Sequence, residues 1–397
     1  MTINLKEFKI IIEKRGLNLD DLIKKLENFK IATPSWAYTS GGTRFYTFKH
    51  KESATSFFEK IKFTGIVNKF TGITPELAIH IPWDKVDDID KSKELLDENN
   101  LKICAINPNL FQDDDYKFGS LTNPKEEIRN KAIEHLYECI DIGKFYKAPY
   151  QSYWFADGTN YPGQADFIQR KYWLLESLKR AYKKLESYMT ILIEYKFYEP
   201  AFYHTDIPDW GTALLYCQKL GEKAKVLVDL GHHAQATNIE FIVANLVDEN
   251  RLGGFHLNSR KYGDDDLTTG SLNLYELFLI FHELIKLGAD DYRRTAFMLD
   301  QSHNLKPPLE AMIQSVISAQ EIYAKALTIN LEELKKAQEK GDIVKAEEIL
   351  KKAFFTDVEP LLLYFRELHE IPLDPLKSYQ NSDFKRKLSQ GIFFKNK

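Results

Sequence analysis

The sequence contains little cysteine and no disulfide-like cysteine pattern. Its 397 residues include only three cysteines, Cys104, Cys139 and Cys217, which lie far apart along the chain. An odd number of widely spaced thiols is typical of reduced cysteines in a reducing compartment. We therefore expect a cytoplasmic protein whose fold depends on a large apolar core and not on disulfide bonds.

Long apolar runs and a strong net charge are also absent. No apolar run approaches the roughly 20 residues that a membrane-spanning helix requires. The stretch MTINLKEFKIIIEKRG carries charges throughout, so we expect no secretory signal peptide. The 54 Lys and Arg residues nearly balance the 58 Asp and Glu residues, giving a net charge of −4. This balance argues against nucleic acid or an anionic membrane as a partner.

The chain instead contains eight short apolar runs separated by stretches with helical periodicity. The runs are Phe29–Tyr38, Glu76–Trp83, Lys102–Asn109, Gln151–Ala156, Met189–Lys196, Lys225–His233, Leu252–Ser259 and Thr295–Ser302. Apolar strands that alternate with two-faced helices indicate a parallel sheet that is buried on both faces. Eight such units are the number that closes an α/β barrel, so we predict a (β/α)8 TIM barrel.

The last part of the chain has a different pattern, because it is almost entirely helical. We predict a catalytic barrel with an N-terminal helical segment over residues 1–306, and a helical extension over residues 307–397 that makes subunit contacts. Within the extension, Gly341 followed by Asp342 predicts the end of one helix and the cap of the next.

Polar and aromatic side chains lie where the predicted strands end, which is the edge at which barrel enzymes carry their chemistry. These residues are His80, Asn107, Trp154, Glu194, Lys196, Asp229, His232, His256 and Asp300. Among them, Glu194, Asp229, His256 and Asp300 follow four neighbouring strands. Three carboxylates and an imidazole that converge in this way predict a site for a divalent cation.

A second cation is predicted beside the first, with Asp229 as a shared ligand. His232 follows Asp229 by three residues, and the run GDDD supplies Asp264 and Asp266 on one side of an extended loop. These oxygen-rich ligands suit Mn²⁺ first, with Co²⁺, Mg²⁺ or Zn²⁺ as alternatives. Each motif alone is weak, because Asp runs in loops are usually solvated, and only their joint occurrence supports a two-metal site.

The same segments resemble the metal centre of bacterial L-rhamnose isomerases of broad specificity, within the xylose-isomerase-like superfamily. The similar segments are IEYK (193–196), VDLGHH (228–233), GGFHLN (253–258), KYGDDDL (261–267), LDQSHN (299–304), TPSWAYTSGGTRF (33–45), LAIHIPWDK (77–85) and INPNLF (106–111). The sequence departs from the family at Ser259 and Arg260, where an acidic residue is usual, and at Tyr38 and Thr39, where a Phe-Gly pair is usual.

The resemblance implies roles for individual residues. Glu194, Asp229, His256 and Asp300 would hold a structural metal, and Asp229, His232, Asp264 and Asp266 would hold a catalytic metal. Lys196, His80, His232 and Asp266 would take part in catalysis. The sugar would contact His80, Trp83, Asn107, Trp154 and Lys196, and Phe45 would reach a neighbouring subunit's site in a homotetramer.

The expected function is therefore the interconversion of an aldose and a ketose, L-rhamnose to L-rhamnulose first, with D-allose, D-psicose and L-mannose as further sugars. We expect a metal-assisted 1,2-hydride shift, with an enediol route left open. The alternatives are another sugar isomerase of the superfamily or a ketose 3-epimerase. A metal-dependent endonuclease on the same barrel is a more distant alternative, because the sequence offers no basic groove. A sugar-binding protein without activity would not need seven ligand residues.

Overall fold

The predicted eight-stranded barrel is confirmed in the computed structural model, which describes residues 4–40, 48–199, 203–286, 295–301 and 305–391. Eight parallel strands form a closed barrel in the order β1-β10-β9-β8-β5-β4-β3-β2. They are β1 (Ala32–Pro34), β2 (Glu76–Ile81), β3 (Lys102–Pro108), β4 (Tyr150–Trp154), β5 (Thr190–Glu194), β8 (Ala224–Asp229), β9 (Leu252–Leu257) and β10 (Ala296–Leu299). The barrel closes where β1 pairs with β10, with Ala32 opposite Met298.

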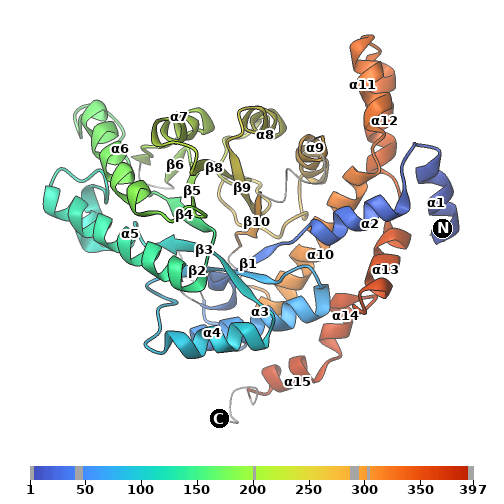
Figure 1. Ribbon diagram of the computed structural model, residues 1–397, viewed down its shortest axis with the longest axis horizontal. Coiled ribbons are helices and arrows are strands. Elements are labelled where there is room, and N and C mark those ends of the chain that lie inside the picture. The colour runs from blue at the N-terminus through green and yellow to red at the C-terminus, as the bar shows by residue number, and fades with distance from the viewer. Residues whose placement is uncertain (1–3, 41–47, 200–202, 287–294, 302–304, 392–397) are drawn as a thin grey trace.

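Helices surround this barrel in sequence order (Figure 1). They are α3 (Phe57–Thr71), α4 (Ile89–Glu98), α5 (Glu126–Tyr146), α6 (Phe167–Lys184), α7 (Trp210–Leu220), α8 (Ile239–Asp248), α9 (Leu274–Ile285) and α10 (Pro308–Leu327). A small antiparallel pair, β6 (Tyr198–Glu199) and β7 (Tyr203–His204), follows β5. Two helices, α1 (Leu5–Glu13) and α2 (Leu19–Asn28), precede the first strand.

The chain ends in a series of shorter helices: α11 (Leu331–Glu339), α12 (Ile343–Phe354), α13 (Glu359–Leu368), α14 (Pro375–Gln380) and α15 (Asp383–Ser389). Helices α11 and α12 project from the body, whereas α13, α14 and α15 run along its side (Figure 1). The predicted helix end and cap are confirmed, because Gly341 has a φ of 67° and the Asp342 side chain accepts a hydrogen bond from the Lys345 N–H.

The helix that follows the last strand lies in the ring of barrel helices. Helix α10 packs between α9 and α3, so it occupies the place of the eighth barrel helix. The division at residues 306 and 307 stays a prediction, and a division after Leu327 would keep this ring intact. The first strand is shorter than the predicted run Phe29–Tyr38, because Ser35–Tyr38 form a 3-10 helix immediately after Pro34.

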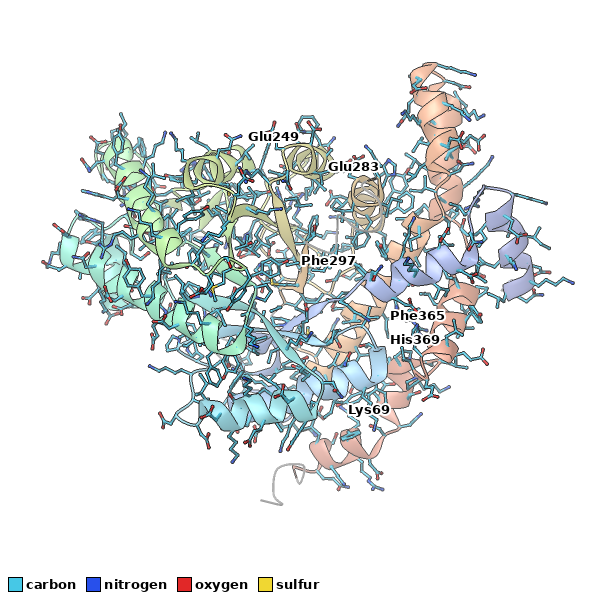
Figure 2. The ribbon with its side chains drawn as sticks, viewed as in Figure 1. Lys69, Glu249, Glu283, Phe297, Phe365 and His369 are labelled. Atoms are coloured by element: carbon cyan, nitrogen blue, oxygen red, sulfur yellow. The ribbon has the colours of Figure 1, made fainter. Side chains whose placement is uncertain are left out.

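The core has two layers. Small and medium side chains, together with Trp36, fill the inside of the barrel, and a much larger apolar layer lies between the strands and the helices. Phe297 belongs to the larger layer and lies in the middle of the molecule, whereas Glu249 lies at its outer edge (Figure 2). The three cysteines are buried and unpaired, as predicted. Within the described residues, every helix is too short or too polar to cross a lipid bilayer.

Candidate metal centre

The candidate site lies at the carboxyl ends of the barrel strands, and the two-residue alternation of each strand turns its side chains inward. Alternate side chains of a barrel strand face the interior. Five candidate residues lie two positions after a side chain of the interior cluster: His80 after Ala78, Asn107 after Ala105, Glu194 after Leu192, Asp229 after Leu227 and Asp300 after Met298. The strands therefore present these polar groups at one end of the barrel, above an apolar interior.

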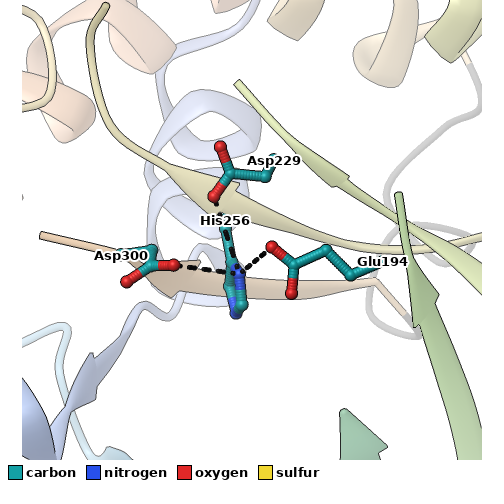
Figure 3. A group of neighbouring side chains, drawn as sticks. All are labelled: Glu194, Asp229, His256 and Asp300. Atoms are coloured by element: carbon teal, nitrogen blue, oxygen red, sulfur yellow. Dashed lines mark hydrogen bonds and ion pairs between the residues drawn. The ribbon is translucent and has the colours of Figure 1, made fainter. Parts of the chain in front are cut away.

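Four of the candidate residues form one cluster, in which three carboxylates lie around the imidazole of His256 (Figure 3). The ligand atoms of Glu194, Asp229, His256 and Asp300 all lie within 4.8 Å of one another. Nδ1 of His256 lies 3.1 Å from Glu194 Oε1, 3.7 Å from Asp229 Oδ2 and 3.5 Å from Asp300 Oδ2. Three carboxylates thus converge on one imidazole, and all four residues come from neighbouring strands or strand ends.

The charged groups of this first cluster change one another's pKa values. Burial disfavours the charged form of His256, but the three neighbouring carboxylates outweigh it and raise the pKa of this imidazole to about 9. Burial and the charges of Glu194 and Asp300 raise the pKa of Asp229 to about 7, against the opposite effect of the two imidazoles. Carboxylates crowded in this way need a cation to remain charged together at neutral pH.

A second group shares Asp229 with the first. The ligand atoms of Asp229, His232 and Asp264 also lie within 4.8 Å of one another. His232 Nε2 is 3.2 Å from Asp264 Oδ1, and His232 Nδ1 is 3.1 Å from the carbonyl oxygen of Tyr195. Burial lowers the pKa of His232, but Asp229, Asp264 and Glu194 raise it overall to about 10.

Asp266 lies near these carboxylates, but it belongs to neither group of the described residues. Burial, followed by the charges of Asp264, Asp300 and Asp229, raises the pKa of Asp266 above its ordinary value. Its backbone adopts the left-handed conformation, with a φ of 46°, which aspartate tolerates better than most residues. Its role as a ligand and as a catalytic residue stays a prediction.

Lys196 brings a buried positive charge to the second group. Its Nζ lies 2.6 Å from Asp264 Oδ2 and 3.1 Å from Glu199 Oε2. Burial disfavours the ammonium ion, but these two carboxylates outweigh it and raise the pKa of Lys196 above its ordinary value. The side chain is therefore protonated at neutral pH and points toward the candidate metal centre.

Aromatic side chains form the wall opposite the carboxylates. The ring of Trp83 stacks on Phe111 with centroids 5.9 Å apart, and Phe111 contacts Trp154 at 4.9 Å. His80 lies against Trp83 and Phe111 at 4.8 and 5.5 Å, and Lys196 Nζ lies 5.2 Å from the Trp154 ring centroid. We call Trp83, Phe111 and Trp154 the aromatic wall.

Two further residues, Asn107 and Phe45, are also predicted sugar contacts. Asn107 is buried, and its side-chain amide donates a hydrogen bond to the Ile79 carbonyl, which leaves its oxygen for a ligand. Phe45 lies outside the described residues. Their roles as substrate contacts stay predictions.

The structure also reveals two positioning residues that the sequence interpretation missed. Trp36 Nε1 donates a hydrogen bond of 2.8 Å to Asp300 Oδ1, and Asn258 Nδ2 donates to both oxygens of Asp229 at 3.0 and 3.1 Å. Asn258 could have been identified by its position two residues after His256, whereas Trp36 lies in the 3-10 helix after β1, where no two-residue spacing points to it.

The two groups fit divalent cations on their own chemistry. Buried carboxylates within 4.8 Å of one another repel, and two imidazoles aimed at them supply the nitrogen ligands that complete an oxygen-rich set. Asn258 and Trp36 hold carboxylate oxygens by hydrogen bonds, as expected for groups that orient metal ligands.

Comparisons with known proteins agree with this fold. Residues 58–302 match the family described as xylose isomerase-like TIM barrel. A protein of Rhizobium meliloti named probable sugar isomerase is 41% identical over 385 residues, which are 95% of this chain and 90% of the relative. The xylose isomerase of Thermus thermophilus is 26% identical over 218 residues, covering 52% of this chain and 56% of the relative. The D-psicose 3-epimerase of Clostridium cellulolyticum shares the fold, with a TM-score of 0.52 at 12% identity over 81% of this chain and 99% of that one. The chain therefore belongs to the xylose isomerase-like TIM barrel family.

Proposed function

We propose that this protein is a divalent-metal-dependent aldose–ketose isomerase, with L-rhamnose as its first candidate substrate. The observation that carries the proposal is the pair of ligand groups joined at Asp229, with the ammonium of Lys196 beside the second group. The relative that is 41% identical over nearly the whole chain is named probable sugar isomerase, which supports the same reaction class.

Glu194, Asp229, His256 and Asp300 would hold one cation, and Asp229, His232 and Asp264, with Asp266 nearby, would hold the second. The ligand chemistry suits Mn²⁺ best, with Co²⁺, Mg²⁺ or Zn²⁺ as alternatives. When bound, the cations supply Lewis acidity that polarises neighbouring sugar oxygens and lowers the pKa of the groups attached to them.

Isomerisation of the open-chain sugar moves one hydrogen from C2 to C1 and one proton from O2 to O1. Lys196 would donate a hydrogen bond to the oxygen at C1 and stabilise the negative charge that develops there. Its ammonium is already oriented by Asp264 and Glu199, so little reorganisation accompanies the reaction. The hydride route is favoured because each described carboxylate around Lys196 is a candidate ligand, lies beside one as Asp266 does, or pairs with the lysine as Glu199 does. None of these described carboxylates is left as a separate base for an enediol route.

His80 and the aromatic wall would bind the rest of the sugar. Burial, followed by the charge of Lys60, lowers the pKa of His80 to about 3, so the imidazole is neutral. A neutral imidazole has one donor and one acceptor nitrogen, and one of them would pair with a sugar hydroxyl. The wall offers apolar surface to a terminal methyl group, which supports L-rhamnose as a candidate.

A ketose 3-epimerase is the second candidate, because the barrel alone is common to both activities. The second ligand group, Asp229, His232 and Asp264, favours the isomerase, since it offers a second cation position. A cytoplasmic homotetramer remains the predicted state of the protein.

The decisive experiment is a substrate survey of the metal-free and metal-loaded protein. L-rhamnose, D-allose, L-mannose, D-xylose and D-psicose would each be incubated with and without Mn²⁺, and the products would be separated by chromatography. Conversion of an aldose to its ketose only with Mn²⁺ supports the proposal. Conversion of D-psicose only to its C3 epimer, without any aldose product, would replace it with the epimerase.

The role of Lys196 is tested by Lys196→Met. We expect kcat to fall by about 10²- to 10³-fold, the cost of removing one preorganised donor to a developing charge. Isothermal titration with Mn²⁺ should still detect two sites, since the lysine is not a ligand. Lys24→Met, an exposed lysine on α2, is the matched control, and unchanged kinetics in Lys196→Met would remove this residue from the mechanism.

A further inference from the structure

The loop after β3 carries Phe111, the central ring of the aromatic wall. Asn109 fixes the shape of this loop, because its Oδ1 accepts hydrogen bonds from the backbone N–H groups of Phe111 and Gln112 at 3.2 and 2.9 Å. The Asn109 side-chain amide also donates to the Gln112 carbonyl at 3.2 Å. The position of Phe111 therefore follows from the position of Asn109.

The backbone of Asn109 is hydrogen-bonded to His135, which lies on α5. The Asn109 N–H is shared between the Ile81 carbonyl at 2.9 Å and His135 Nε2 at 3.1 Å. A backbone N–H can only donate, so Nε2 of His135 is the acceptor and the ring carries its hydrogen on Nδ1. That hydrogen is directed at Glu138 Oε2, which lies 3.1 Å away.

Glu138 connects the same helix to the loop after β2. Its Oε1 lies 2.5 Å from Lys85 Nζ, and Lys85 follows Trp83 by two residues. The pair His135 and Glu138, which we call the α5 bracket, therefore contacts both loops whose rings stack as Trp83 and Phe111. The Lys85 link is exposed to solvent and contributes little, so the bond to Asn109 is the main one.

We propose that His135 is a positioning residue that holds Phe111 against Trp83 and Trp154 and so sets which sugars the pocket accepts. The sugar part of this inference rests on the proposed function, whereas the effect on the loop does not. Among the described residues, the hydrogen bonds of His135 go to Asn109, Glu138 and Cys139. Its link to Phe111 therefore runs through the backbone of Asn109.

The bracket has the features of a directed contact and not of core packing. His135 is half-buried, and both of its ring nitrogens are used in opposite directions, one toward a loop and one toward the next turn of its own helix. An apolar residue of similar size would serve equally well for packing at this position, but it would leave the Asn109 N–H with the Ile81 carbonyl alone.

The first arm of the test is hydrogen exchange of the peptide that contains residues 109–112, in the protein without sugar. His135→Leu should speed exchange of these amides by about three- to tenfold, the effect of losing one hydrogen bond of ordinary strength. His135→Gln places an amide oxygen near the position of Nε2 and should restore the wild-type rate. Glu186→Gln is the control, because it removes an ion pair with Lys144, which lies on α5 like His135. This variant should leave the exchange rate unchanged. An unchanged rate in His135→Leu would overturn the proposal.

The second arm is a comparison of KM values between a 6-deoxy aldose and its 6-hydroxy counterpart, L-rhamnose and L-mannose. His135→Leu should raise KM by about three- to tenfold, unequally for the two sugars, with kcat and Mn²⁺ binding unchanged and with His135→Gln close to wild type. Equal KM values in all variants would overturn the role in specificity. If the wild-type protein converts neither sugar, the proposed function fails, and the exchange rates still decide whether His135 positions the loop.

Discussion

Asp229 is the residue on which both groups of candidate ligands depend. Its two oxygens are oriented by Asn258, and its Oδ1 also accepts a hydrogen bond of 2.6 Å from the Gly231 N–H. These neutral N–H donors fix the orientation of the carboxylate and add no positive charge beside it. A single side chain therefore controls the negative charge that both cation sites would use.

We expect Asp229→Asn to weaken both sites together, because asparagine keeps the shape of the side chain but loses its charge. Orienting residues alone typically change metal affinity by about 10- to 100-fold, so removal of a shared ligand should cost at least about 100-fold at each site. Titration calorimetry with Mn²⁺ measures this effect. Asp97→Asn, an exposed carboxylate of α4, is the control, and normal two-site binding in Asp229→Asn would contradict the shared role.

The titrating groups of the metal-free site predict how stability depends on pH. The pKa values of His256, His232 and Asp229 are raised to about 9, 10 and 7, so each group binds its proton more tightly in the folded than in the unfolded protein. Their stabilising contribution is complete below the unfolded pKa values and is lost as the pH rises through the folded ones. The metal-free protein should therefore lose the contribution of Asp229 between about pH 4 and pH 7, and that of the two imidazoles between about pH 6.5 and pH 10.

Thermal unfolding of the metal-free protein at pH 7, 8.5 and 10 tests this expectation, with a fall in Tm of roughly 1 °C for each kcal/mol lost. Mn²⁺ should reverse the fall, because cations replace the protons and bind more tightly as the imidazoles deprotonate. The double variant His232→Gln with His256→Gln should show a flatter Tm profile over this range. A Tm that rises with pH in the metal-free wild type would be inconsistent with the raised pKa values.

Strand β9 is the element that carries His256, and a small residue inside it sets the distance to β10. Gly254 lies opposite Ala296, and a Cβ added to Gly254 would lie 2.8 Å from the Ala296 carbonyl oxygen. That contact is with backbone, so the two strands would have to move apart. We expect Gly254→Ala to lower the free energy of unfolding by about 1–3 kcal/mol.

The same substitution should also weaken metal binding, because His256 follows Gly254 by two residues on the same face of the strand. Denaturant unfolding and Mn²⁺ titration measure the two effects. Gly211→Ala on α7 is the control, since its added Cβ would meet only the Asp209 side chain at 3.3 Å. A stable Gly254→Ala variant with normal Mn²⁺ affinity would show that the strand spacing is not limiting.

The strands could be predicted from the sequence, whereas the hydrogen bonds that position some site residues could not. Apolar runs and their two-residue alternation are local properties, so they identify the strands and the polar groups at their ends. The short β1 could not be foreseen, because Ser35–Tyr38 continue the apolar pattern but form a 3-10 helix. The bond from Trp36 to Asp300 and the bond from His135 to the Asn109 backbone join distant parts of the chain, and no spacing along the sequence encodes them.

The last two helices, α14 and α15, pack against the outside of the barrel. Tyr379 of α14 is fully buried and packs edge-to-face on Phe70 of α3 at 5.5 Å. Lys385 of α15 lies 2.9 Å from the buried Glu52 and 2.6 Å from Glu310 of α10. These contacts connect the end of the chain to two barrel helices and to the segment that precedes α3.

We expect a protein truncated after Leu373 to lose about 3–5 kcal/mol of unfolding free energy, the usual effect of removing a buried aromatic side chain. Loss of Lys385 adds to this effect, because it leaves the charge of Glu52 buried without its ammonium partner. Calorimetric unfolding measures the change. Truncation after Gly391 keeps both contacts and is the control, and equal Tm values for the two truncated proteins would contradict a stabilising role for α14 and α15.

The pairing of β1 with β10 has a consequence for synthesis of the chain on the ribosome. Ala32 finds its partner, Met298, only after most of the protein has been made. At translation rates of about 5–20 residues per second, β1 waits for about 13–50 seconds, and the nascent sheet keeps two open edges during that time. We therefore expect ribosome-bound chains that end before β10 to recruit chaperones and to be sensitive to proteases, and full-length chains to become resistant soon after release.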